Sequence, residues 1–208
     1  GQDSDTSVTG WFVMALQSAR MARMDVPAET LQRVTQYLDT AALEDGTRYG
    51  YWQKMQPTNA VAAEGLLCRQ YLGWAQNDPR LVEGISRLVK TAPIQYGGGI
   101  NHDVYYWYYA TQAAHHMEGK IWGEWNKVMR HVVPAQQVRA GAEAGSWNPQ
   151  GDVWGNSTGR LYVTCLSIYM LEVYYRHLPI YSGYKAFGGN APAPVEGSEP
   201  GVSDSPAP

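Results

Sequence analysis

Two aspartates near the start of the chain, in "QDSDTSVTGWFVMALQSAR" (residues 2–20), are the first residues that could do chemistry. Asp3 and Asp5 are spaced as paired carboxylates, and such a pair can hold one carboxyl protonated so that it acts as a general acid. The alternative is structural, because an Asp directly before a helical apolar run caps the helix by accepting backbone N–H bonds. Asp103 precedes "VYYWYY" in the same way, which favours capping. We therefore predict no catalytic residue, with Asp3 and Asp5 as the only candidates.

A second set of residues has side chains that suit a metal ion. His102, Asp103, His115 and His116 offer imidazole and carboxylate ligands. The two adjacent histidines point in different directions on a helix, and His102 lies at the opposite end of the same run. The spacing therefore predicts partly buried polar histidines, with no metal and no cofactor.

The densest aromatic feature is "YYWYYATQ" at residues 105–112. Tyr105, Tyr109, Gln112 and His116 share one helix face by their spacing of three and four residues. This face suits the wall of a ligand-binding cavity, an aromatic core with its hydroxyls bonded across helices, or an aromatic surface for a protein partner. Together with Trp11, these residues form the predicted ligand-binding set.

The elements that position these residues repeat along the chain. The run at residues 5–19 aligns without a gap with residues 160–174, and residues 57–73 and 103–117 fit the same frame, with starts 52, 46 and 57 residues apart. Second helical segments follow the first three runs, at residues 27–43, 78–92 and 122–137. Gly/aromatic loops separate one pair from the next. The pattern predicts an all-α fold of about seven helices, as three helix pairs plus a last helix at 159–177.

Length and charge exclude several classes of protein. A chain of 208 residues forms one domain, and its net charge of −3 argues against a nucleic-acid partner. No apolar run is long enough for a transmembrane segment. The fifteen tyrosines and eight tryptophans suit half-wet cavities and interfaces, and Cys68 and Cys165 are predicted to be buried thiols. We predict a repeat domain over residues 1–184 and a Pro/Gly/Ser-rich C-terminal tail over residues 185–208.

The loops "AGSWNPQGDVWG" and "EDGTRYGYW" resemble the Gly/Trp loops of the squalene-cyclase and prenyltransferase repeat. The runs "DTSVTGWFVMALQSAR", "YYWYYATQAAHHM" and "GRLYVTCLSIYMLEVYYRHLPIY" are also similar to squalene-cyclase-like proteins of planctomycete bacteria that have no assigned function. This resemblance covers Asp5 to about Tyr181. It implies a partial α/α toroid, in which inner helices line a central cavity and outer helices wrap them.

Class II terpene cyclases of this family protonate their substrate with a D-x-D-D motif at the start of an inner helix. The corresponding text here is "DSDTS", and aligning Thr6 with the family's Thr places Ser4 where the acid would stand. A serine cannot protonate an alkene, so the motif is broken. The resemblance thus favours a fold of this family without its acid.

These observations predict a non-catalytic protein-binding or scaffolding domain, with a protein partner or a homo-oligomer as its ligand. The alternative is a class II terpene cyclase-like or prenyl-chain enzyme fragment with its acid motif upstream. A third hypothesis is an isoprenoid- or lipid-binding protein. We expect a soluble protein of the bacterial cytoplasm or periplasm, without a choice between these two compartments.

Overall fold

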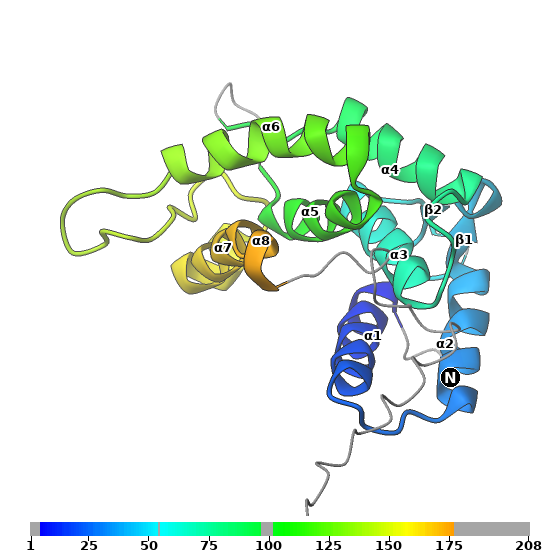
Figure 1. The fold of residues 1–208 in the computed structure, drawn as a ribbon. Coiled ribbons are helices and arrows are strands. Elements are labelled where there is room, and N and C mark those ends of the chain that lie inside the picture. The colour runs from blue at the N-terminus through cyan, green and yellow to red at the C-terminus, as the bar shows by residue number, and fades with distance from the viewer. Residues whose placement is uncertain (1–4, 54, 97–101, 177–208) are drawn as a thin grey trace, which may run out of the picture.

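The computed structural model describes residues 5–53, 55–96 and 102–176. In these ranges the chain forms eight α-helices and one two-stranded sheet (Figure 1). The helices are α1 Thr6–Met21, α2 Ala28–Ala41, α3 Asn59–Tyr71, α4 Pro79–Thr91, α5 Val104–Met117, α6 Gly119–Ala135, α7 Gly155–Leu171 and α8 Val173–Arg176. The predicted helical fold is confirmed, while the predicted tail at 185–208 lies outside the described residues.

The long helices form two rows. Helices α1, α3, α5 and α7 make one row, in which each helix contacts the next, and we call it the inner row. Helices α2, α4 and α6 each contact the inner helix that precedes them in the chain. Figure 1 shows the inner row bending, with α2, α4 and α6 along the outside of the bend. Within the described residues the inner row is open at both ends and does not form a closed ring.

The core lies in the middle of the inner row. Every residue of α3 after Asn59 is buried, and so is every residue of α5 except the half-buried Tyr105. Both helices have neighbours on several sides, because α3 touches α1, α4 and α5 while α5 touches α3, α4, α6 and α7. A helix covered in this way has no polar face toward solvent, so the polar side chains of α3 and α5, such as Glu64, Arg69 and Gln112, are buried with the apolar ones. The outer helix α4 instead buries one stripe, which contains Leu81, Ile85 and Leu88.

Side chains fix where the helices begin. The Asp5 carboxylate accepts the backbone N–H of Val8 at 2.7 Å, and the Asp103 carboxylate accepts that of Tyr106 at 3.0 Å. Asp78 caps α4 in the same way, with Pro79 at the first helical position. The predicted helix starts at Asp5, Asp78 and Asp103 are therefore confirmed.

The chain is mostly helical, as predicted, apart from one small two-stranded sheet after α2. Strand β1 (Ala42–Leu43), at the end of the predicted helix at residues 27–43, pairs antiparallel with β2 (Arg48–Tyr49). Helix α2 ends where Ala42 becomes extended, and the chain then turns between the strands through a 3₁₀ segment in which Asp45 has φ 55° and Gly46 has φ 86°. Strand β2 packs closely on α3. The Tyr49 ring lies so near Gly65 that a Cβ at this position would be only 2.3 Å from it.

The last inner helix also differs from its prediction. It begins at Gly155 and ends at Leu171, and Gly159 inside it has a non-helical φ of 79°. The predicted start at residue 159 therefore marks this break, after which the regular helix begins. Cys165 on α7 is half-buried and Cys68 on α3 is buried, and both are free thiols, so the prediction of two buried thiols holds for Cys68 alone.

Candidate functional site

The structure places Asp5 as a helix cap. Its carboxylate accepts hydrogen bonds from the Ser7 hydroxyl at 2.6 Å and the Val8 N–H at 2.7 Å. Desolvation raises the pKa of Asp5, but these hydrogen bonds outweigh it and hold the pKa below its ordinary value. A carboxyl with a lowered pKa is ionised at neutral pH and has no proton to donate. The geometry thus supports the capping interpretation of Asp5, while Asp3 lies outside the described residues.

Replacing the cap should cost stability in a way that separates the two interpretations of Asp5. We expect Asp5→Ala to lower the free energy of unfolding by about 1 kcal/mol, because the first turn of α1 loses its acceptor. Asp5→Asn should keep most of that stability, because an amide oxygen caps nearly as well. Urea denaturation of both variants measures the difference. Equal losses in the two variants would contradict capping.

Three of the predicted ligand-binding residues lie in the contact between α5 and α3. The Tyr71 hydroxyl donates to Oε1 of Gln112 at 3.3 Å and lies 3.3 Å from Nε2 of His116. Tyr109 is fully buried. The face shared by these residues, predicted from their spacing, is therefore present in the structure as a polar and aromatic seam between two inner helices. That it binds a ligand stays a prediction.

The chemical centre of this seam is Glu64 on α3, which the sequence did not single out. Its side chain is completely buried, and Oε2 accepts a long hydrogen bond of 3.4 Å from the Tyr105 hydroxyl. Oε1 has no hydrogen-bond partner within the described parts of the chain and lies against α1, where a Cβ at Gly10 would stand only 2.0 Å from it. Glu64, Tyr105 and Tyr109 thus bring a carboxyl and two phenols together beneath α1.

The surroundings of Glu64 favour its neutral form. Desolvation raises the pKa of Glu64 well above its ordinary value of 4.5, although the Tyr109 and Tyr105 hydroxyls act in the opposite direction. Burial raises the pKa of Tyr105, and the Glu64 carboxyl raises it further. The cluster therefore holds a protonated carboxyl at a pH at which an exposed glutamate is ionised. A signal was present in the sequence, because Glu64 is the one charged residue in the apolar run "NAVAAEGLLC".

Trp11 joins this centre to a bridge of rings across the inner row. Its indole stacks on Tyr108 with the ring centroids 5.8 Å apart and meets Tyr109 edge-on at 6.0 Å. Tyr108 in turn lies 6.0 Å from Tyr169 of α7. We call Trp11, Tyr108, Tyr109 and Tyr169 the aromatic bridge. Trp11 nevertheless stays 44% exposed.

The histidines considered for a metal are used in packing. The His102 ring stacks on Trp107 with centroids 5.7 Å apart, and Asp152 beside it accepts the Val104 N–H at 3.0 Å. His115 turns to Trp122 at 5.0 Å, whereas His116 lies against Tyr71. Across residues 5–53, 55–96 and 102–176, no group of three His, Cys, Asp or Glu side chains could hold a metal ion.

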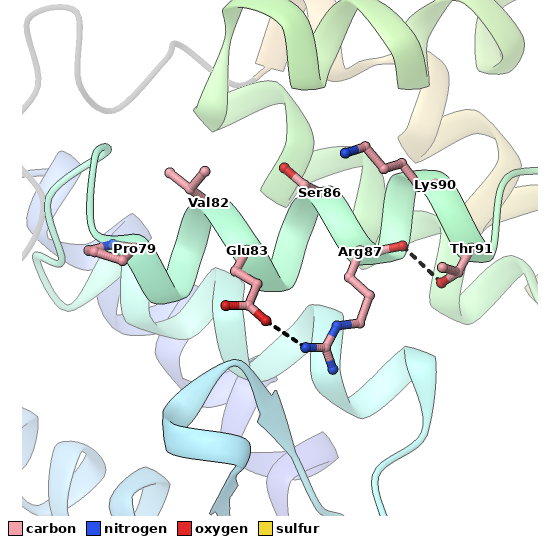
Figure 2. A pocket seen from close by; sticks show the side chains of 7 residues that line it. All are labelled: Pro79, Val82, Glu83, Ser86, Arg87, Lys90 and Thr91. Atoms are coloured by element: carbon pink, nitrogen blue, oxygen red, sulfur yellow. Dashed lines mark hydrogen bonds and ion pairs between the residues drawn. The ribbon is translucent and has the colours of Figure 1, made fainter.

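A shallow depression runs along the outer face of α4, as Figure 2 shows. All of its lining residues belong to this one helix: Pro79, Val82, Glu83, Ser86, Arg87, Lys90 and Thr91. Glu83 and Arg87 form an ion pair of 2.7 Å within it. A depression formed by one helix has no opposing wall, so it does not enclose a ligand as a binding cleft does.

Comparisons with protein-family models, curated proteins and solved structures find no match to this chain. In the part of the chain that the structure describes, no helix combines the length and the apolar character needed to cross a membrane.

Proposed function

We propose that this chain is a non-catalytic protein-binding or scaffolding domain, built on a partial α/α toroid of the squalene-cyclase and prenyltransferase type. The alternation of inner and outer helices and the open inner row support this architecture. The observation that carries the function is the exposure of large apolar side chains at both ends of that row. Phe12 on α1 is 65% exposed and Leu161 on α7 is 76% exposed.

Exposed apolar side chains at the ends of a helical array are costly unless something covers them. Arrays of stacked repeats need terminal faces that are polar, because each repeat buries its apolar face only against a neighbour. Here Val8 and Trp11 accompany Phe12 at one end, and Ile168 accompanies Leu161 at the other. Within the described residues, neither end has the polar face of a cap. A protein partner on these faces would bury them as the inner helices bury one another.

Glu64 supports a second candidate, in which the chain handles an isoprenoid or another apolar ligand. A neutral buried carboxyl beside the rings of Tyr105, Tyr109 and Trp11 is the group that acid catalysis on such a ligand requires. In this candidate the acid would be Glu64, between α1, α3 and α5, and not a residue of the broken "DSDTS" motif. The same contacts equally serve to join three helices, so the first candidate keeps priority.

Native mass spectrometry of the purified chain, followed by denaturation of the same sample, separates the two candidates. A multimer, or a complex with a second protein, and no additional small-molecule mass is the expected result. A monomer carrying a lipid-sized mass that leaves on denaturation would overturn protein binding and support the second candidate. A bare monomer at every concentration would overturn both.

A further inference from the structure

The two terminal helices of the inner row pack with opposite faces. In the gapless alignment of residues 5–19 with 160–174, positions 6–16 of α1 correspond to positions 161–171 of α7, and Gln17 corresponds to Glu172, which directly follows α7. The buried face of α1 is formed by Thr6, Gly10, Val13 and Gln17, and its exposed face by Val8, Trp11, Phe12 and Ala15. The counterparts of the exposed set, Val163, Leu166, Ser167 and Met170, are the buried face of α7. The counterparts of the buried set, Leu161, Cys165, Ile168 and Glu172, are exposed or half-exposed.

This reversal follows from the position of each helix in the inner row. Among the described residues of the inner row, α1 packs along α3 and α7 packs along α5 on its other side, while Trp11 of α1 also stacks on Tyr108 of α5. An interior helix such as α3 or α5 must bury both faces, and both of them are indeed buried all round. The residues exposed on α1 therefore correspond, in the alignment, to the residues with which α7 packs on α5. The residues exposed on α7 correspond in the same way to the residues with which α1 packs on α3.

We propose that a second copy of this chain occupies these faces, with α1 of one copy packed head to tail against α7 of the other. This inference rests on the proposed function and names its partner. The contact would continue the inner row with the same two helix faces that form the α1–α3 and α5–α7 contacts within one chain. An unrelated partner would have to fit each end separately, whereas one copy carries both complementary faces.

The composition of the two open faces agrees with a helix–helix contact. Val8, Phe12 and Ala15 form an uncharged stripe on α1, and Leu161 and Ile168 form one on α7. Their spacing of three, four and seven residues places each stripe along one side of its helix. A head-to-tail contact uses different surfaces on the two copies, so it either closes into a ring or extends into an open chain of copies.

The test uses one acidic substitution at each end and measures association by sedimentation velocity over a concentration series. Phe12→Glu blocks the α1 face and Leu161→Glu blocks the α7 face, and each should weaken self-association by at least about tenfold, as for a central interface residue. Val82→Glu, on the outer face of α4 (Figure 2), introduces the same charge at a side chain that is 40% exposed and should leave association unchanged.

Mixing the two blocked variants is the decisive step. The Phe12→Glu chain keeps its α7 face and the Leu161→Glu chain keeps its α1 face, so an equimolar mixture should form a one-to-one complex. An interface that pairs α1 with α1, or α7 with α7, would leave one variant associating alone and would give no mixed complex. That result, or a wild-type chain that stays monomeric, would overturn the proposal.

A second pair of variants guards against loss of folding, and a second measurement separates failure of this proposal from failure of the proposed function. Val8→Glu and Ile168→Glu form a second pair at the same faces, to be used if either first variant loses its helical circular dichroism. Native mass spectrometry distinguishes failure of the head-to-tail contact from failure of the proposed protein-binding function. A complex with another protein but not with a second copy would overturn the head-to-tail contact alone, and a lipid-sized mass would overturn protein binding itself.

Discussion

Replacing Arg69 by Ala is expected to lower the free energy of unfolding by about 3–4 kcal/mol, as for loss of a large buried side chain together with its hydrogen bonds. Arg69 lies on α3 and is among the largest fully buried side chains. Its Nε donates to the Tyr49 hydroxyl at 2.9 Å, and a terminal nitrogen donates to Asp39 of α2. The guanidinium also lies over the Trp74 ring, 4.9 Å from its centroid.

The loss should be large because Arg69 connects three segments at one point. It ties α3 to β2 through Tyr49 and to α2 through Asp39, and Tyr49 is completely buried. Truncation would leave the Tyr49 hydroxyl without its donor and open a void beside the ring. Most of the expected cost therefore comes from packing and desolvation, because Asp39 itself is largely exposed and can be solvated.

Chemical denaturation of Arg69→Ala, Arg69→Met and Arg33→Ala tests this account. Arg69→Met keeps much of the volume and should lose less than the Ala variant. Arg33 forms an ion pair with Glu29 on the exposed side of α2, so Arg33→Ala should cost no more than about 0.5 kcal/mol. A loss at Arg69→Ala no larger than that at Arg33→Ala would contradict the role given to Arg69.

Glu64→Gln should make the protein more stable than the wild type at neutral pH, with an advantage that grows as the pH rises. Folding raises the pKa of Glu64 well above 4.5, so the folded chain binds a proton that the unfolded chain has already released. Below the pKa of Glu64 in the unfolded chain, this group is protonated in both states and its ionisation takes nothing from the free energy of unfolding of the wild type. Above that pKa, this free energy falls by about 1.4 kcal/mol per pH unit until the folded pKa is reached. Glutamine has the same shape without this ionisation.

Urea denaturation at about pH 5 and about pH 7 measures this difference, which should be larger at the higher pH. Glu29→Gln is the matched control, because Glu29 is exposed on α2 and its substitution should give nearly the same difference at both pH values. A Glu64→Gln effect that does not change with pH, or that shrinks as the pH rises, would show that folding leaves Glu64 ionised.

Local signals made much of the fold predictable. The caps Asp5, Asp78 and Asp103 each mark the start of a helix within one residue of its position in the structure. These signals act over a single turn, so they depend little on tertiary contacts. The strand at Ala42–Leu43 was missed because its sequence carries no extended preference. It is extended because it pairs with β2, whose Tyr49 is held against α3 by tertiary contacts with Gly65 and Arg69.

The candidate site was predictable only in part, for a related reason. Helical spacing placed Tyr105, Tyr109, Gln112 and His116 on one face, because that follows from the geometry of a single helix. It gave no information on which helix faces them, and so Glu64 and Tyr71 of α3 were missed. A lone glutamate in an apolar run is a visible signal. Its partners, Gly10 on α1 and Tyr105 on α5, come from segments that only the fold brings together.

The burial of α3 and α5 in the middle of the inner row bears on the order in which the chain folds. Each long helix mainly contacts helices close to it in the chain, as in linear repeat arrays, where folding can begin in one part and propagate to its neighbours. We expect the α3–α5 pair, which has the most contacts, to form early, and we expect α1 and α7, which are covered on fewer sides, to join later and fray first. The open faces of α1 and α7 then exist only once this nucleus has formed, so association would follow folding and would protect the ends of the array from local unfolding.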